Sequence, residues 1–414
     1  MFSSRWKLLA SPGKFLSGQS KPRVVGAILF LLLAIWGGLY LWGQHFFEAA
    51  QASCQQYHYE KAAALIKKCL AVWPRDYHTN LLAARICRAR AEYPQAEKHL
   101  AVCWKQQGKT EEVELEWLLL RAQKGDFLEL ETPMRKRLDD GHSQATLILE
   151  AMAFCYIKDG RYIRAGQILD QWLEIAPNGM AYFWRGMARL KQGAGKGARA
   201  DFRQALEWDP DLWEARFQLV RLLLAGNDFE EGGEHLAVLE HNHPGRPEVW
   251  LLEGMDQFRK GDLEAAENHL DKAVQAMPAN AVALTERAKL ALEKGRPIEA
   301  EQWFRKALEA EPSLIAPHFY LYQCLNLQPG REKEAQIELE KHKECQQRFE
   351  RQNKILEEVE KSPNDADRLV EAAEFFLVNR QFPMARQLLL RALQAQPNHP
   401  KARKHLATSF QDTR

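Results

Sequence analysis

Two short segments contain residue types that bind phosphate or metals, but neither has the full spacing that this chemistry needs. Gly193–Gly197 (GAGKG) looks at first like a phosphate-binding loop. However, Leu190 stands where such a loop needs a glycine, and Gly197 stands where Ser or Thr would bind magnesium. His241 and His243 form a pair, whereas a zinc site needs three or four converging ligands. We therefore expect neither nucleotide nor metal binding.

The seven cysteines do not form any Cys-x-x-Cys pair, which argues against redox or zinc-ribbon chemistry. The sequence also lacks Gly-x-Ser-x-Gly and His-Glu-x-x-His motifs. Cys69 and Cys103 stand at small-residue positions of the repeat described below, so we expect them to be buried packing residues. The sequence thus predicts no enzyme, no metal and no cofactor.

The composition predicts a large folded protein rather than a disordered or nucleic-acid-binding one. The chain has 414 residues, of which 46% are hydrophobic and 27% charged. Its formal net charge of +2 gives no polyanion-binding signature, so nucleic acid is not an expected partner. The charge is uneven, because residues 1–23 contain five Lys or Arg and no acid, which leaves −3 on the remainder.

The twenty residues 24–43 (VVGAILFLLLAIWGGLYLWG) carry no charge. A helix of this length spans about 30 Å, the thickness of a bilayer core, so we expect one transmembrane helix. Trp36, Tyr40 and Trp42 would lie at its interface with water. The alternatives are a buried soluble helix and a signal peptide cleaved near Ala52. The small pair Ala34 and Gly38 would permit self-association.

The positive charges predict the orientation of this span. The basic residues 1–23 precede it, and the first Lys or Arg after it is Lys61. Because positive segments stay in the cytoplasm, we expect a cytoplasmic N-terminus and an extracytoplasmic remainder, which is periplasmic if the source is bacterial.

The rest of the chain repeats with a period of 34 residues. Prolines recur at positions 177, 210, 244, 278 and 312, and each closes the same phrase, as in Ala198, Phe202, Ala205, Pro210. This spacing places the first three residues on one stripe of a helix, which the proline ends. A second helical stripe precedes each phrase across a short turn such as Lys260-Gly-Asp262. The unit is helix, turn, helix, proline.

This unit resembles the tetratricopeptide repeat (TPR), and the resemblance covers almost everything from residue 43 onward. The family implies an all-α fold, a right-handed superhelix of about ten helix-turn-helix repeats, preceded here by the transmembrane helix. We expect repeats to start at 43, 77, 111, 146, 179, 213, 247, 281, 315 and 366. The domains would then be 1–23 (basic N-terminus), 24–43 (transmembrane helix), 43–349 (repeats one to nine), 350–365 (charged helical extension), 366–399 (repeat ten) and 400–414 (capping helix and tail).

Three departures from the family pattern are expected. Thr132-Pro133 should interrupt the second helix of the third repeat and restart it. The charged stretch from Arg331 to Lys361 should form one long exposed helix, and its extra half period should bend the array. The first repeat begins at Gly43 without a linker, so it should lie close to the membrane surface.

The resemblance also implies where a partner binds, because ligands of this family contact first-helix residues that face away from the second helix. Phe and Met dominate these positions in repeats four to seven, and Arg221 and Lys289 could orient a partner. The alternative is that these side chains pack across a tightly curved superhelix. The groove lacks the Lys/Asn/Arg set that clamps chaperone tails. The predicted groove residues are Phe154, Phe183, Met187, Phe217, Arg221, Leu251, Met255, Phe258 and Lys289.

We therefore expect a membrane-anchored, non-enzymatic scaffold that captures protein or peptide partners in a concave apolar groove. Assembly, secretion or maturation of an envelope complex is its expected role, which rests on family analogy. One alternative is an organelle-membrane receptor or adaptor with its repeats in the cytosol. Another is a structural array that assembles with copies of itself.

Overall fold

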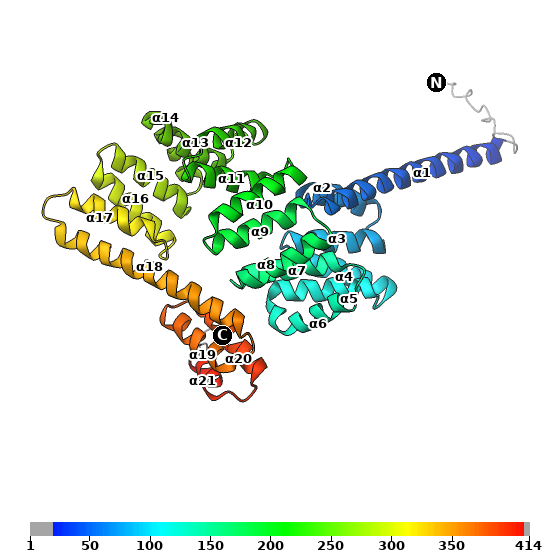
Figure 1. Cartoon of the computed structure of the whole chain (residues 1–414). Helices are drawn as coiled ribbons and strands as arrows, with labels where there is room; N and C mark the ends of the chain where they lie inside the picture. Colours follow the sequence, from blue (N-terminus) through cyan, green and yellow to red (C-terminus); the bar gives the residue numbers. More distant parts are fainter. Residues whose placement is uncertain (1–19, 410–414) are drawn as a thin grey trace, which may run out of the picture. The chain divides into compact units, whose positions relative to one another are not determined.

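The computed structural model describes residues 20–409, and side chains from residue 29 to residue 408. The expectation of a basic cytoplasmic segment falls largely on residues 1–19, which lie outside the described residues. All regular elements of the described range are helices, and consecutive helices pack in pairs (Figure 1). The chain forms two compact units, residues 1–124 and 125–414. The expected and observed first-helix starts differ by at most one residue from Tyr77 onward.

Unit 1 contains the apolar N-terminal helix and two complete repeats. Its core is formed where small residues such as Ala62, Cys69, Ala96 and Cys103 let neighbouring helices approach. Cys69 and Cys103 are fully buried, which confirms the expected packing role. The helices are α1 (Ser20–Gln55), α2 (Tyr59–Val72), α3 (Tyr77–Ala89), α4 (Tyr93–Gln107) and α5 (Glu111–Arg121).

Helix α1 is continuous from the apolar segment into the first repeat. Its part from Leu29 to Gln55 is long and apolar enough to cross a membrane, by length and composition. Large side chains of this part are exposed, including Phe30 (73%) and Trp36 (67%). Farther along, a Cβ at Gly43 would lie 2.9 Å from the Trp73 ring, so the end of α2 packs tightly against α1 at this point.

The third repeat departs from the regular pattern. A π-helical turn, η1 (Ala122–Asp126), follows α5, and Gly125 within it has a φ of 145°. The boundary between the two units falls in this turn. The expected break at Thr132-Pro133 is wrong, because α6 (Phe127–Asp139) runs through Pro133. Buried Leu130 and Met134 on either side hold this helix in place and outweigh the hydrogen bond that proline removes.

Unit 2 contains the regular repeats. Every member of the repeated phrase Ala198-Phe202-Ala205 is fully buried, and so are its copies at 266–273, 300–307 and 385–392. The alanines allow close helix approach, and the large residue between them fills the core. The helices after α6 are α7 (Ala145–Lys158), α8 (Tyr162–Ile175), α9 (Gly179–Lys191), α10 (Gly195–Trp208), α11 (Trp213–Ala225), α12 (Phe229–Asn242), α13 (Pro247–Lys260), α14 (Leu263–Ala276), α15 (Ala281–Glu293), α16 (Pro297–Ala310), α17 (Ala316–Asn326), α18 (Glu332–Lys361), α19 (Ala366–Val378), α20 (Phe382–Ala395) and α21 (Pro400–Ser409).

Helix α18 is a single helix of 30 residues, in agreement with the expected long charged helix (Figure 1). Its far end contacts α8, and α20 contacts α6. The last repeat therefore returns to the first helices of unit 2 instead of extending away from them. The extra length of α18, which has no counterpart in the other described repeats, makes this return possible.

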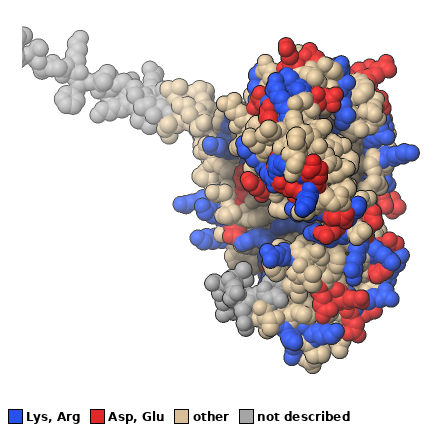
Figure 2. Space-filling model, turned by 90° about the vertical axis from the view of Figure 1, so that its left-hand side faces the viewer, with Lys and Arg blue, Asp and Glu red and all other residues tan. Residues whose placement is uncertain are grey.

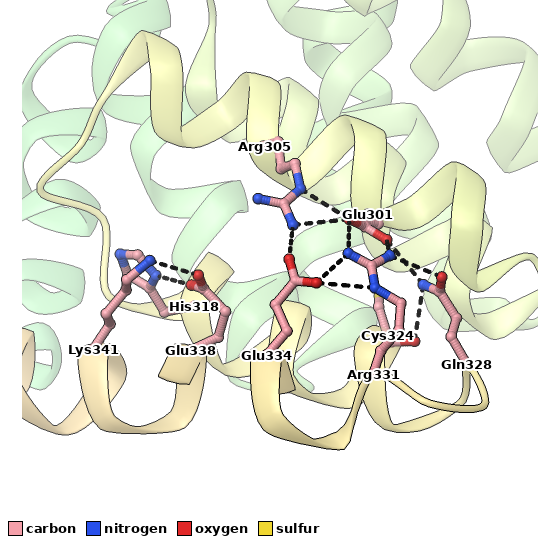
Figure 3. Close-up of polar contacts among 9 residues, drawn as sticks. All are labelled: Glu301, Arg305, His318, Cys324, Gln328, Arg331, Glu334, Glu338 and Lys341. Atoms are coloured by element: carbon pink, nitrogen blue, oxygen red, sulfur yellow. Dashed lines mark hydrogen bonds and ion pairs between the residues drawn. The ribbon is translucent and has the colours of Figure 1, made fainter. Parts of the chain in front are cut away.

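Ion pairs attach the start of α18 to the preceding repeat (Figure 3). The two carboxylate oxygens of Glu301 in α16 accept hydrogen bonds from Arg331 at 2.6 and 3.1 Å. Arg305 donates to Glu334 of α18 at 2.5 Å, and His318 of α17 lies 2.7 Å from Glu338. On the face shown in Figure 2, basic and acidic side chains are interspersed. The polar network of this region is thus largely internally paired.

Candidate partner-binding groove

The predicted groove residues lie on the first helices α7, α9, α11, α13 and α15, one helix from each of five consecutive repeats. Spacings of three and four residues place Phe183 with Met187, and Leu251 with Met255 and Phe258, on the same side of their helices. The nine side chains therefore belong to five helices of unit 2. None of the nine is among the exposed large hydrophobic residues of the described chain.

Three of the nine are core residues in the isolated chain. Phe183, Leu251 and Met255 are only 8%, 2% and 5% exposed. The Phe183 ring lies 6.0 Å from the ring of Phe202, the large residue of the repeated phrase in α10. These three side chains belong to the packed core, and a partner would reach them only if neighbouring side chains moved.

Four other predicted residues are half-buried apolar side chains. Phe154 lies 6.3 Å from Trp184, and Phe217 lies 6.1 Å from Trp213, with ring centroids measured in both pairs. Met187 packs on the cluster around Phe183 and Phe202, and Phe258 packs on the cluster that contains Met255. Each has a buried side and an open side, which is the arrangement that an apolar contact surface needs. Their role in binding stays a prediction.

Arg221 is the one predicted groove cation that lacks an internal partner within the described part of the chain. It is half-buried on α11 and makes neither an ion pair nor a hydrogen bond through its side chain with the described residues. Burial lowers the pKa of the Arg221 guanidinium. A desolvated cation without a counter-ion is unfavourable in the free chain. An ion pair between Arg221 and a carboxylate from a partner would offset this cost.

Lys289 differs from Arg221 because its charge is already balanced. Its ammonium donates to Glu286 at 2.7 Å and lies 5.3 Å from the centre of the Tyr320 ring. A partner carboxylate would have to compete with Glu286 for this lysine. The electrostatic part of the candidate groove is therefore centred on Arg221.

The segments with phosphate- or metal-binding residue types have structural roles. Gly193 has a φ of 79° and forms the turn between α9 and α10, as the repeat pattern requires. His243 packs against Trp213 with ring centroids 6.0 Å apart. No group of three or more His, Cys, Asp or Glu side chains in the described residues could hold a metal ion.

Sequence reasoning missed a second open surface in the last part of unit 2. Arg351 of α18 lies over the Phe375 ring of α19 at 5.6 Å, beside a groove of about 960 Å³ between these helices. Val378 at the end of α19 is 83% exposed. The repeat pattern does not indicate this groove, because α18 is longer than a repeat helix. The second half of α18 has no equivalent residues in the other repeats.

Comparison with protein families decides the identity of the repeat. Two tetratricopeptide repeat models match the chain, over residues 189–255 and 251–315. The chain is a tetratricopeptide repeat protein. Its repeats mark it as a protein–protein interaction scaffold with protein or peptide partners, and the TPR fold is typically non-enzymatic.

Solved structures with a similar arrangement are distant in sequence. PilW, a type IV pilus biogenesis factor, is 21% identical, with 48% of this chain and 93% of PilW covered and a TM-score of 0.41. The human IFIT1 dimer with PPP-AAAA is 16% identical, with 83% and 88% covered and a TM-score of 0.47. TTC0263, a thermophilic TPR protein of Thermus thermophilus, is 21% identical, with 48% and 99% covered and a TM-score of 0.36. No curated protein sequence matches the chain.

Proposed function

We propose that this TPR protein is a membrane-anchored scaffold that captures a partner polypeptide along the first helices of repeats four to eight. The observation that carries the proposal is the set of half-buried apolar side chains on the first helices α9, α11 and α13, together with Arg221 of α11, a cation without a partner in the described chain. The exposed apolar part of α1 supplies the anchor.

The partner we propose is an amphipathic helix or extended segment that carries an acidic residue. Its apolar side chains would cover Met187, Phe217 and Phe258, and its carboxylate would pair with Arg221. A charge-assisted hydrogen bond to a guanidinium that is already partly desolvated favours binding, because most of the dehydration has occurred during folding.

We also propose that the repeats lie outside the cytoplasm and hold components of an envelope complex during its assembly, secretion or maturation. The five basic residues before the span support this orientation. The continuous helix α1 would then hold the first repeat at the membrane surface, since no linker separates Gly43 from the apolar segment.

Site-specific photo-crosslinking in the cells that make the protein tests this proposal. A photoreactive phenylalanine analogue would replace Met187 or Phe258 in the full-length chain. Control positions are Trp208 and Ile298, which are 53% and 63% exposed on second helices. We expect both groove positions to give the same adduct and the controls to lack it.

The variant Arg221→Gln provides the second arm of this experiment. We expect it to reduce the adduct at both groove positions at least tenfold while the protein stays folded, because no internal interaction of the described chain is lost. Adducts at the control positions alone would refute the groove. An adduct that consists of a second copy of the chain would support the self-assembling array instead, and a cytosolic partner would support the receptor.

A further inference from the structure

A cavity of about 590 Å³ lies where the last repeat of unit 2 meets its first helices. Residues of α6 and α8 line one side, and residues of α20 and the turn between α18 and α19 line the other. Gln394 of α20 donates to the carbonyl of Leu128 in α6 at 2.9 Å and holds the two sides together. The cavity thus exists only because the chain returns on itself.

Arginines dominate the charged lining of this cavity. Arg135, Arg161, Arg164 and Arg391 line it together with two glutamates, Glu129 and Glu131. A further carboxylate, Glu360, lies beside them at the end of α18. The lining alone therefore carries two more positive than negative charges, and one more when Glu360 is counted.

Three of the four arginines already form hydrogen bonds with these carboxylates. Arg135 donates to Glu131 at 3.4 Å and to the Tyr156 hydroxyl at 2.6 Å. Arg161 donates to Glu131 at 2.7 Å and to Glu360 at 3.4 Å, and Arg164 donates to Glu360 at 2.7 Å. Glu131 also accepts a hydrogen bond from the hydroxyl of Tyr156 at 2.7 Å. Asp159, another nearby carboxyl, forms no hydrogen bond with Arg391 in the described chain.

Arg391 is left without a hydrogen bond to the residues that the structure describes. Arg391 is only 6% exposed, and its Nη2 atom is buried without a hydrogen-bond partner. Its Nη1 atom lies 3.9 Å from the nearest oxygen of Glu360. Burial, reinforced by the neighbouring Arg161 cation, lowers the pKa of Arg391 to about 10. A buried guanidinium without a hydrogen-bond partner is strongly unfavourable, so the site favours an anion that the described chain itself does not supply.

We propose that this cavity is a binding site for a phosphate group, with Arg391, Arg164 and Arg135 as its donors. A phosphate anion would balance the excess positive charge of the lining. The planar guanidinium matches the geometry of phosphate oxygens. The cavity is much larger than one phosphate ion, so part of an organic phosphomonoester fits beside the phosphate. Because the group would contact both sides of the cavity, its binding stabilises the return of the last repeat.

Thermal unfolding of the full-length protein in detergent tests the site. Sodium phosphate is compared with sodium chloride at equal ionic strength, and phenyl phosphate tests for the organic portion. We expect phosphate to raise Tm by about 5 °C at a hundredfold excess over Kd, since a ligand that binds only the folded state stabilises it. A larger shift at lower concentration with phenyl phosphate would identify a phosphomonoester, and equal shifts would identify free phosphate.

The variant Arg391→Met separates binding from a structural role. It keeps much of the length of the side chain and removes the unpaired charge, so we expect an unchanged or higher Tm without phosphate and no shift with phosphate. Arg386→Met on the exposed side of the same helix is the control and should keep the full shift. The absence of a phosphate-specific shift in the wild type, or a lower Tm of Arg391→Met without phosphate, would overturn the proposal.

Discussion

Arg161 and Glu360 are 199 residues apart in the sequence, and their side chains form an ion pair of 3.4 Å in unit 2. Both are buried, at 6% and 7% side-chain exposure, and Arg164 donates to the same carboxylate at 2.7 Å. This carboxylate joins the end of the long helix α18 to α8. The contact closes a loop of nearly two hundred residues within unit 2.

We predict that Glu360→Gln destabilises unit 2 by about 3 kcal/mol, because it leaves Arg161 and Arg164 buried with one carboxylate fewer. Urea unfolding should show the loss, and hydrogen exchange should become faster in α6, α8 and α20. The control Glu357→Gln lies one turn earlier on α18, where the side chain is 56% exposed, and should change stability little. Equal effects of the two variants would show that the closing contact does not hold the array.

The repeated phrase made the helices predictable from the sequence. The contact between the last repeat and the first helices of unit 2 was not predictable. Ala198, Phe202 and Ala205 determine local packing, and the same local contacts recur at each copy of the phrase. The pairing of Arg161 with Glu360 depends on small rotations that accumulate over several repeats. A short-range sequence pattern does not give the total rotation over several repeats. Neither the cavity nor the role of Arg391 could therefore be inferred from the sequence.

For the candidate groove residues, the sequence predicts which side of each helix they lie on. It does not predict how deeply each side chain is buried. Helical phase places Phe183 and Met187 on one side of α9, yet Phe183 is a core residue and Met187 is half-buried. The difference arises because Phe183 meets Phe202 of the next helix, and phase alone does not give that distance. Arg221 and Lys289 likewise look equivalent in sequence, but Glu286 neutralises only Lys289.

Close packing between the two helices of a repeat gives a second prediction. A Cβ at Gly254 of α13 would lie 2.6 Å from Leu270 of α14, so Gly254→Ala should destabilise unit 2 by about 1–3 kcal/mol. Gly233 of α12 has open space around its Cβ position, and Gly233→Ala should stabilise the helix by roughly 0.5–1 kcal/mol. Urea unfolding of the two variants would reveal these opposite signs; stabilisation by both would contradict the packing.

The carboxyl of Asp159 should make the stability of the protein depend on pH. Burial raises the pKa of this carboxyl from 3.8 to about 6, so the folded state holds its proton more tightly than the unfolded state. Stability is therefore lost as pH rises from about 4 to 6. We expect Asp159→Asn to be about 3 kcal/mol more stable than the wild type at pH 8, with no difference below pH 4. Asp140→Asn, at the same position after α6 but exposed, is the control for the Asn side chain itself.

The cysteines should differ sharply in reactivity. Five are buried, and burial raises the pKa of half-buried Cys87 to about 11, with Glu92 adding to the shift. Only roughly one in a thousand Cys87 thiols is then a thiolate at pH 8. Cys345 on α18 is half-buried, so we expect it to be the single thiol that reacts rapidly with Ellman's reagent in the folded protein. Cys345→Ser should abolish the rapid phase, and a second rapid thiol in that variant would contradict the burial of the other cysteines.

The same thiol tests the proposed orientation. If the repeats are extracytoplasmic, a membrane-impermeant maleimide should label Cys345 before the membrane is permeabilised, since in the proposed topology α1 is the span and all later residues lie on one side of it. Cys345→Ser should lose the label, which assigns it to this position. Labelling only after permeabilisation would place the repeats in the cytosol. It would leave the groove around Arg221 intact, because that groove depends on the packing of α9, α11 and α13 and not on the side of the membrane that they face.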